Sequence, residues 1–169
     1  MNTLKYGLAV IVAGAALVQP QVNAQEGNGN SWRSLEGVWL VRLAPKVCAT
    51  GAPVPVPPTL NLFTFHEGGT MSGSLQNYAI SATNRTLSHG LWSPNHAGGQ
   101  GEYQVRFIHL RYDFATGVFI GSQDAQSALV LNAEGNAFTA DSSTTGIDAN
   151  GNVAYRNCAT LTGERVQLP

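Results

Sequence analysis

Two stretches, LEGVWLVRLAPKVC (residues 35–48) and CATLTGER (residues 158–165), decide the fold of this chain. In an antiparallel strand pair, opposed residues have numbers whose sum is nearly constant. That sum is 204 for Trp39 with Arg165 and 206 for Cys48 with Cys158. One register can therefore satisfy both a disulfide and a contact of Arg165 with the indole ring. Such a register would pair the first strand with the last and close the sheet into a barrel.

The N-terminal segment has the pattern of a secretory signal. Lys5 precedes the apolar run 8–18, and small residues precede the expected cleavage point. The apolar run is too short to span a bilayer. We therefore expect residues 1–24 to be a signal peptide, residues 25–34 a flexible polar leader and residues 35–169 a single β-barrel domain. The mature protein should be secreted or periplasmic, without integral membrane association.

Export gives the two cysteines a role, because oxidising compartments favour disulfides. We expect Cys48 and Cys158 to be bridged, the alternative being two buried free thiols. The net charge is -1 and only 11% of residues are charged, so no basic face is available for nucleic acid. The same composition provides no polybasic patch for a membrane surface.

The rest of the chain has the pattern of an all-β meander. Short runs rich in Val, Phe, Tyr, Thr and Leu alternate with clusters of Gly, Asn and Asp, and no long helical periodicity is present. The expected strands are 38–43, 59–66, 70–76, 88–92, 102–112, 118–131 with a bend, 137–148 and 153–166. The last three turns begin with Asp or Asn and end near Gly, which favours tight hairpins. We expect an eight-stranded antiparallel up-and-down barrel, closed by first-to-last strand pairing.

Two connections are longer than hairpin turns. Residues 44–58 contain four prolines between positions 53 and 58, so this connection should be stiff and extended. Residues 77–87 form the other long connection. Loops of this length on a barrel commonly form its lid.

The triplet Gly37-Val38-Trp39 matches the Gly-x-Trp that opens the first strand of the lipocalins, and Arg165 stands in the last strand, where a basic residue packs over that Trp. With the long connection after the first strand, these residues make the chain resemble the lipocalin and wider calycin group. The resemblance implies structural roles for Gly37, Trp39 and Arg165. Because no Thr-Asp-Tyr type motif precedes the seventh strand, it points to a calycin-like relative. Avidin-like and allene-oxide-cyclase or dirigent-like barrels are alternatives.

The strand 102–112 carries the residues most suited to chemistry. Tyr103, Val105 and Phe107 share a face with His109 and Arg111, so the apolar face changes sides midway. A β-bulge near Phe107 would keep His109 and Arg111 outside the barrel. A straight strand would instead point them into a mostly apolar cavity, where they would need partners and mark a ligand or catalytic site.

The segment 88–96 is a second candidate, because His89, Trp92 and His96 could line a barrel mouth. The alternative is an exposed loop with Trp92 filling the core. The four His show no metal-ligand spacing, so we expect no metal. Nucleotide and nucleophile motifs are also absent from the sequence, so we expect no cofactor.

Three functions are compatible with this pattern. The first is a binding module that holds a small apolar or amphipathic molecule, with Trp92, Tyr103, Phe107 and His109 as ligand-binding candidates. The second is a cofactor-independent cyclase or isomerase in the same cavity. It would use His109 or His89 for proton transfer and Arg111 to stabilise negative charge. The third is a protein-interaction or inhibitor module that uses the loops.

Overall fold

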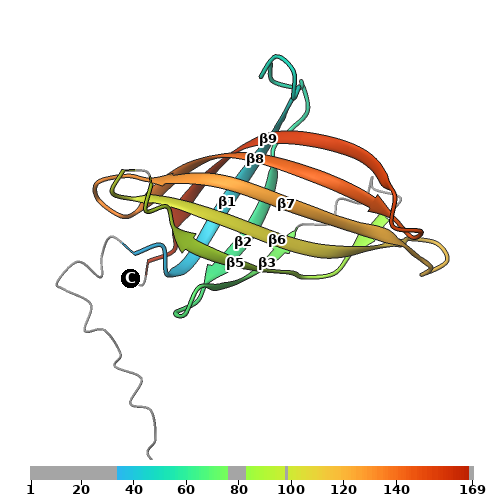
Figure 1. The fold of residues 1–169 in the computed structure, drawn as a ribbon, viewed down its shortest axis with the longest axis horizontal. Helices are drawn as coiled ribbons and strands as arrows, with labels where there is room; N and C mark the ends of the chain where they lie inside the picture. Colours follow the sequence, from blue (N-terminus) through green and yellow to red (C-terminus); the bar gives the residue numbers. More distant parts are fainter. Residues whose placement is uncertain (1–33, 76–82, 98, 168–169) are drawn as a thin grey trace, which may run out of the picture.

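A computed structural model describes residues 34–75, 83–97 and 99–167, and these ranges contain nine antiparallel strands and no helix (Figure 1). The strands are β1 (Gly37–Lys46), β2 (Thr59–Phe65), β3 (Thr70–Leu75), β4 (Thr83–Arg85), β5 (Ser88–Pro94), β6 (Glu102–Asp113), β7 (Phe119–Leu131), β8 (Ala137–Asp148) and β9 (Val153–Arg165). Within those ranges no helix is available to cross a bilayer. The expected signal peptide and all but the last residue of the expected leader lie outside the described residues.

The strands form a closed up-and-down barrel. Leaving β4 aside, strands that follow one another in sequence pair with each other, β3 with β5 included, and β1 pairs with both β2 and β9. The short strand β4 and the longer β5 pair with different parts of β6, so together they occupy one interrupted strand position. The prediction of an eight-stranded antiparallel barrel closed by first-to-last pairing is therefore confirmed, with β4 as an additional strand. This architecture is compatible with a calycin-like fold.

The register at the closure sets Trp39 opposite Arg165 as the sequence predicts, and it is offset by two residues from a direct Cys48–Cys158 pair. Trp39 pairs with Arg165, and Lys46 pairs with Cys158. Cys48 lies two residues beyond Lys46 and forms a disulfide with Cys158 across a Cα–Cα distance of 5.1 Å. The disulfide therefore fixes one end of the β1–β9 ladder.

Two differences from the predicted strands have local causes. The first strand continues through Pro45 to Lys46, because it stays paired with β9 there, whereas its pairing with β2 ends at Leu43. The Pro45 carbonyl accepts a hydrogen bond from the Val54 amide on the loop side, so the missing proline N–H removes no bond to β9. The second difference is β4, which lies in the connection predicted as loop and pairs with the end of β6.

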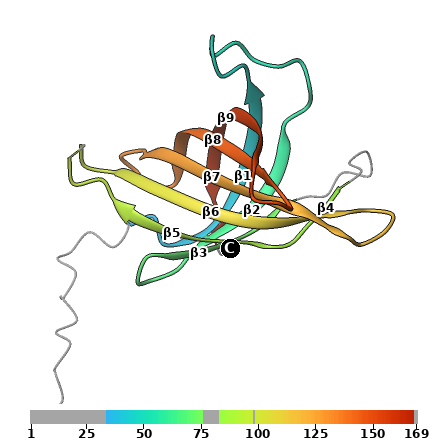
Figure 2. The same cartoon turned by 45° about the vertical axis from the view of Figure 1, so that its right-hand side comes forward.

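The loop 47–58 between β1 and β2 projects from the barrel in both ribbon views (Figures 1 and 2). Its residues are exposed except for Val54, and a bond from the Val47 amide to the Ala52 carbonyl, 2.8 Å long, stiffens its tip. The expected lid over the barrel is thus not formed in this structure. Only Val54 reaches the interior space described below.

One end of the barrel is sealed by apolar packing. Leu35 and Trp39 are fully buried, and the indole Nε1 donates to the Leu35 carbonyl at 2.9 Å. The Phe138 ring lies 5.0 Å from the Trp39 ring, and the Arg165 guanidinium lies 4.4 Å from the Trp39 ring centroid. We call this the closed end. It is the end from which the β7–β8 turn projects, opposite the β6–β7 and β8–β9 hairpins (Figure 1).

Candidate ligand cavity at the open end of the barrel

Strand β6 runs straight and delivers its odd-numbered side chains to the interior. Tyr103, Val105, Phe107 and His109 are all buried, while the residues between them are exposed. Pairing with β7 is continuous from Glu102 to Arg111, and its one register shift lies after Arg111.

Of the two alternatives for this strand, the bulge near Phe107 is therefore wrong and the straight strand is confirmed. The impression that the apolar face changes sides comes from Ile108 and Leu110. These are apolar residues on the outer face, with 42% and 39% of their surface exposed. Exposed apolar residues are ordinary on protein surfaces, so the alternation of apolar and polar residues does not by itself show which face of this strand points inward.

His109 opens onto an interior cavity of about 410 Å³ at the open end. This volume lies within the usual range for small-molecule sites. The lining residues are Leu43, Pro45, Lys46, Val54, Thr59, Arg85, Phe107, His109, Gln123, Ala125, Ser142, Thr144, Asn157, Cys158 and Ala159. Phe107, Ala125 and Ala159 are the buried apolar members, whereas Pro45, Val54 and the charged Lys46 and Arg85 are partly exposed.

The room for this cavity comes from small side chains on facing strands. Ala125, Ser142 and Ala159 are buried inward-facing residues of β7, β8 and β9. The interior glycines contribute less, because aromatic rings cover them. A Cβ added at Gly146 would lie 2.2 Å from the Tyr155 ring, for example. The glycine-rich character of the sequence therefore does not by itself create the space.

The floor of the cavity is aromatic. Phe107 lines the cavity and makes an edge contact with Phe63, with ring centroids 5.3 Å apart. Phe63 in turn contacts Phe65, which lies towards the closed end. A molecule in the cavity would thus meet a rigid apolar surface at its inner end.

His109 is the most deeply buried titratable group of the cavity, with 4% of its surface exposed. Its Nε2 lies 2.6 Å from Gln123 Oε1, which accepts the ring proton. Its Nδ1 is buried without a partner among the described residues. Burial, and to a lesser degree the nearby charges of Arg85 and Arg111, lower the pKa of His109 to about 4. The ring is therefore neutral at pH 7 and presents a free lone pair.

Other interior polar groups are also unsatisfied. Both polar atoms of Asn61 and the Ser88 hydroxyl are buried with no hydrogen-bond partner in the described part of the chain. Ser127, by contrast, donates to Ser142 at 3.0 Å. Buried polar groups are normally paired, so the unpartnered atoms of Asn61 and Ser88 could form hydrogen bonds with a molecule inside the barrel.

Arg111 lies one inward position beyond His109, and its guanidinium lies 5.2 Å from the centroid of the Tyr155 ring. Its Nε is buried without a partner among the described residues. Arg85 stands opposite Arg111 in the β4–β6 register and lines the cavity. Sequence reasoning missed Arg85, because it assigned residues 77–87 to a loop. A predicted strand that began before residue 88 and included residue 85 would have identified Arg85.

The structure separates the other ligand-binding candidates from this cavity. Trp92 lies towards the closed end, where its Nε1 donates to the His66 and Thr70 carbonyls at 3.0 Å. Its ring lies 5.7 Å from that of Tyr103, and neither residue is among those lining the cavity. Of the four candidates, the structure brings together only Phe107 and His109.

His89 is exposed and follows the inward-facing Ser88, so its side chain lies on the outer face of β5. A role for His89 in proton transfer inside the barrel does not fit this position. His96 is exposed on the loop after β5. Among the described residues, no group of three or more His, Cys, Asp or Glu is placed to hold a metal ion.

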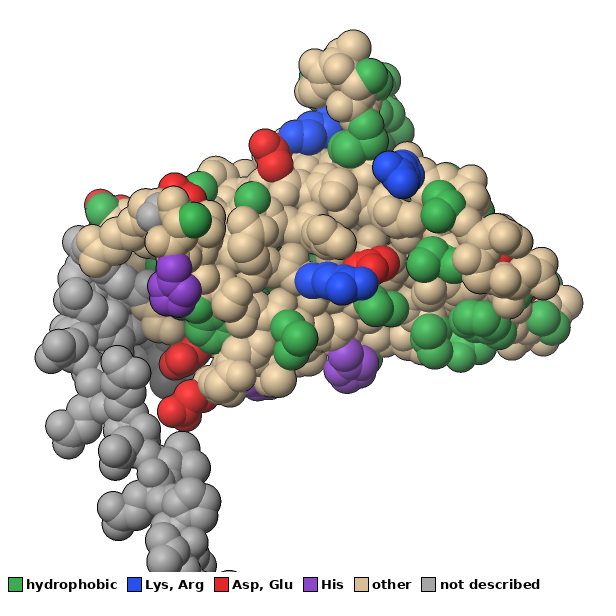
Figure 3. Space-filling view, viewed as in Figure 1, with side chains coloured by type: hydrophobic (Ala, Val, Ile, Leu, Met, Phe, Trp, Pro, Cys, Tyr) green, Lys and Arg blue, Asp and Glu red, His purple; other side chains and the backbone are tan. Residues whose placement is uncertain are grey.

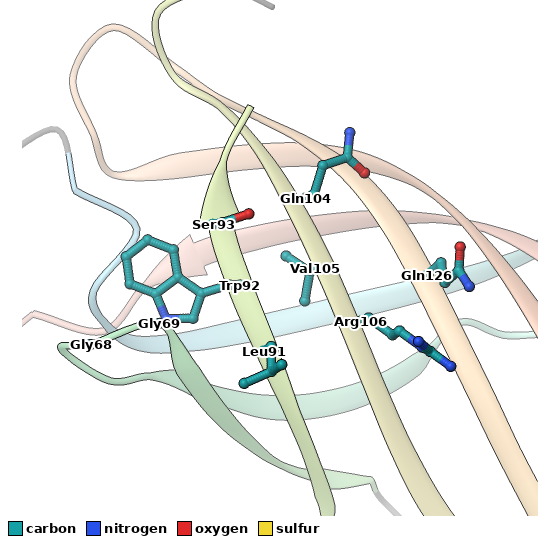
Figure 4. Close-up of a pocket in the computed structure, with 9 residues that line it drawn as sticks. All are labelled: Gly68, Gly69, Leu91, Trp92, Ser93, Gln104, Val105, Arg106 and Gln126. Carbon is teal, nitrogen blue, oxygen red and sulfur yellow. The ribbon is translucent and has the colours of Figure 1, made fainter. Parts of the chain in front are cut away.

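A larger hollow of about 550 Å³ lies over the outer face of β5, β6 and β7 (Figure 4). Leu91, Gln104 and Gln126 in its lining are exposed, and Arg106 forms a two-point ion pair with Asp124, including Nη2–Oδ2 at 2.6 Å. Its charge is thus already paired. The interior cavity, with the unpartnered Nδ1 of His109 in its lining, is the better candidate site.

Hydrophobic side chains also gather at the end of the molecule that carries the β6–β7 hairpin (Figure 3). Leu110, Phe114, Val118 and Phe119 are exposed there, beside the open end of the barrel.

No protein-family model matches this chain, and no curated protein sequence matches it.

Proposed function

We propose that this protein is an exported binding module that holds an amphipathic small molecule in the cavity at the open end of its barrel. The observation that carries the proposal is an interior cavity with Phe107 at its inner end and, nearer its mouth, the unpartnered Nδ1 of His109 and the side chain of Arg85. Such a lining matches a molecule with an apolar body and a polar end. The Cys48–Cys158 disulfide is in keeping with export.

The direct test fills the cavity from the inside. In Ala125→Leu, the larger side chain occupies the space opposite Phe107, its partner in the β6–β7 register. We expect the mature wild-type protein to bind Nile red with micromolar affinity, about -8 kcal/mol, and 1-decanol to displace the dye. The Ala125→Leu variant should lose at least tenfold in affinity for the dye.

Ala128→Leu is the matched control, because Ala128 is exposed on the outer face of the same strand. It should bind the dye as the wild type does. Thermal unfolding of both variants shows that each is folded. Equal dye binding by the folded Ala125→Leu variant would place the dye outside the cavity and contradict the proposal.

The inward position of His109 also favours a second candidate, a cofactor-independent isomerase or cyclase. His109 Nδ1 would accept a proton from the substrate, and Arg111 would stabilise the negative charge that develops. A base with a pKa of about 4 is weak, however, and the neutral ring has no proton to donate through Nδ1. Binding without turnover is therefore the preferred function. Recovery of bound ligands chemically altered by wild type but unchanged by His109→Gln would favour catalysis.

A further inference from the structure

Two arginines face each other inside the open end of the barrel without a carboxylate between them. Arg85 on β4 and Arg111 on β6 are directly paired in register, so their side chains leave the same face of the sheet. Arg111 continues the inward-facing series of Phe107 and His109, and Arg85 lines the cavity. Both guanidinium groups therefore belong to the interior of the mouth.

Neither arginine forms an ion pair within the described residues, where the two salt bridges are Lys46–Asp141 and Arg106–Asp124. The acidic residues that end β6 and β8 are engaged in their own turns. Asp113 accepts from the amides of Ala115 and Thr116. Asp148 likewise accepts from the amides of Asn150 and Asn152.

This arrangement is unfavourable without an anion. Like charges directly opposite each other in a sheet destabilise it, and burial adds to the cost of each charge. Both effects appear at Arg85, where burial above all, and to a lesser degree the charge of Arg111, lower the pKa of the guanidinium, although Tyr155 raises it in part. The Tyr155 ring offers Arg111 a π face, which does not neutralise its charge.

We propose that Arg85 and Arg111 bind the carboxylate head group of the amphipathic ligand, whose apolar chain extends past His109 towards Phe107 and Ala125. The inference rests on the proposed function and adds the chemical class of the ligand. Arginine presents a planar fork of donors that matches a carboxylate in two-point contact. The free Nε of Arg111 is one such donor.

His109 lies beside the same head group, but it can donate to a carboxylate from Nδ1 only after the ring takes up a proton, because the neutral ring presents a lone pair there. His109 is the inward position before Arg111, and among the described residues its ring bonds to Gln123 while Nδ1 has no partner. A carboxylate between Arg85 and Arg111 would cancel the positive field that disfavours protonation of the ring. Ligand binding should therefore raise the pKa of His109.

Calorimetric titration of the mature protein with decanoate and with uncharged 1-decanol tests the proposal. The wild type should bind decanoate at least tenfold more tightly than 1-decanol. Arg85→Gln and Arg111→Gln should each lose at least tenfold in decanoate affinity, and their 1-decanol affinity should change less than twofold. Arg156→Gln is the control, because Arg156 is exposed on β9 next to Tyr155. It should leave both affinities unchanged.

Stability separates loss of the site from loss of the fold. Because Arg85→Gln removes one of two opposed like charges, we expect its unfolding temperature without ligand to equal or exceed that of wild type. If 1-decanol binds but decanoate binds no better and the arginine variants match wild type, the carboxylate site is wrong while the proposed function stands. If neither compound binds the folded wild type, the proposed function itself fails, and the carboxylate site with it.

Discussion

Arg165 concentrates several interactions in one side chain at the closed end. Its guanidinium lies over the Trp39 ring, Nε donates to the Gly135 carbonyl at 2.7 Å, and the two Nη atoms donate to the Glu36 and Ser34 carbonyls. The side chain thus ties the start of β1 to the β7–β8 turn and covers the indole. Removing it would leave carbonyls unpaired as well as uncovering the ring.

We therefore expect Arg165→Ala to lower the free energy of unfolding by about 3 kcal/mol, from lost cation–π attraction, stem packing and hydrogen bonds. Urea unfolding of the mature protein measures it. Arg165→Lys should recover part of the loss, because the charge remains while the planar fork is lost. Arg156→Ala, at an exposed site, should change the midpoint little. An unchanged midpoint for Arg165→Ala would show that Trp39 is held without it.

His109 makes the stability of the unliganded protein depend on pH. Its pKa of about 4 in the folded state lies below its ordinary value of 6.5, so the unfolded chain binds a proton more readily. Stability should fall as the pH falls from about 6.5 to about 4, by up to about 3 kcal/mol in total. Unfolding of wild type and His109→Gln at a series of pH values isolates this effect. Parallel curves for the two proteins would mean that His109 is not protected from protonation.

At the scale of elements, the β1–β9 ladder is the seam that closes the barrel. The Cys48–Cys158 disulfide spans 110 residues and holds this seam beside the projecting loop 47–58. In the chain-entropy account, a crosslink over so long a loop stabilises the fold by up to about 5 kcal/mol. Residual structure in the unfolded chain makes the effect smaller than this limit.

We expect the exported protein to resist alkylation of both cysteines until it is reduced, as intact mass can show. The double variant Cys48→Ser, Cys158→Ser should unfold at a lower urea concentration than the oxidised wild type. Under reducing conditions the two proteins should behave alike. Full alkylation of the native protein without reductant would contradict a bridge between these residues.

The closure of the barrel was accessible from sequence because it depends on few positions. Trp39, Arg165 and the two cysteines define one antiparallel register, and the last three turns carry explicit Asn, Asp and Gly signals. Strand alternation at β6 was less informative. Ile108 and Leu110 are apolar yet lie on the outer face, and only the pairing with β7 shows that the strand stays in register.

The candidate site was only partly accessible. Phe107 and His109 were identified from the sequence, whereas Arg85 was not, because the β4 strand that presents it has only three residues. The size of the cavity also depends on contacts that no local pattern encodes. An example is the Tyr155 ring, which lies over Gly146 of the neighbouring strand.

The polarity of the interior side chains changes along the axis of the barrel. Aromatic and aliphatic side chains around Trp39 seal the closed end, Phe107 forms a floor inside the barrel, and the polar side chains of His109 and Arg85 line the cavity nearer the open end. This gradient matches the two parts of an amphipathic molecule. It also explains why Trp92 and Tyr103, which pack towards the closed end, contribute to stability rather than to the cavity.

The measurement that tests the central claim most directly is a two-dimensional amide NMR titration of the mature protein, with whichever of decanoate and 1-decanol binds more tightly. We predict saturable shifts at Phe107, Ala125 and Ala159, which line the interior cavity. The amides of Leu91 and Gln126, at the outer hollow, should move little. Shifts confined to the outer hollow, or no saturable shift at the cavity residues, would contradict the claim that the barrel interior is the binding site.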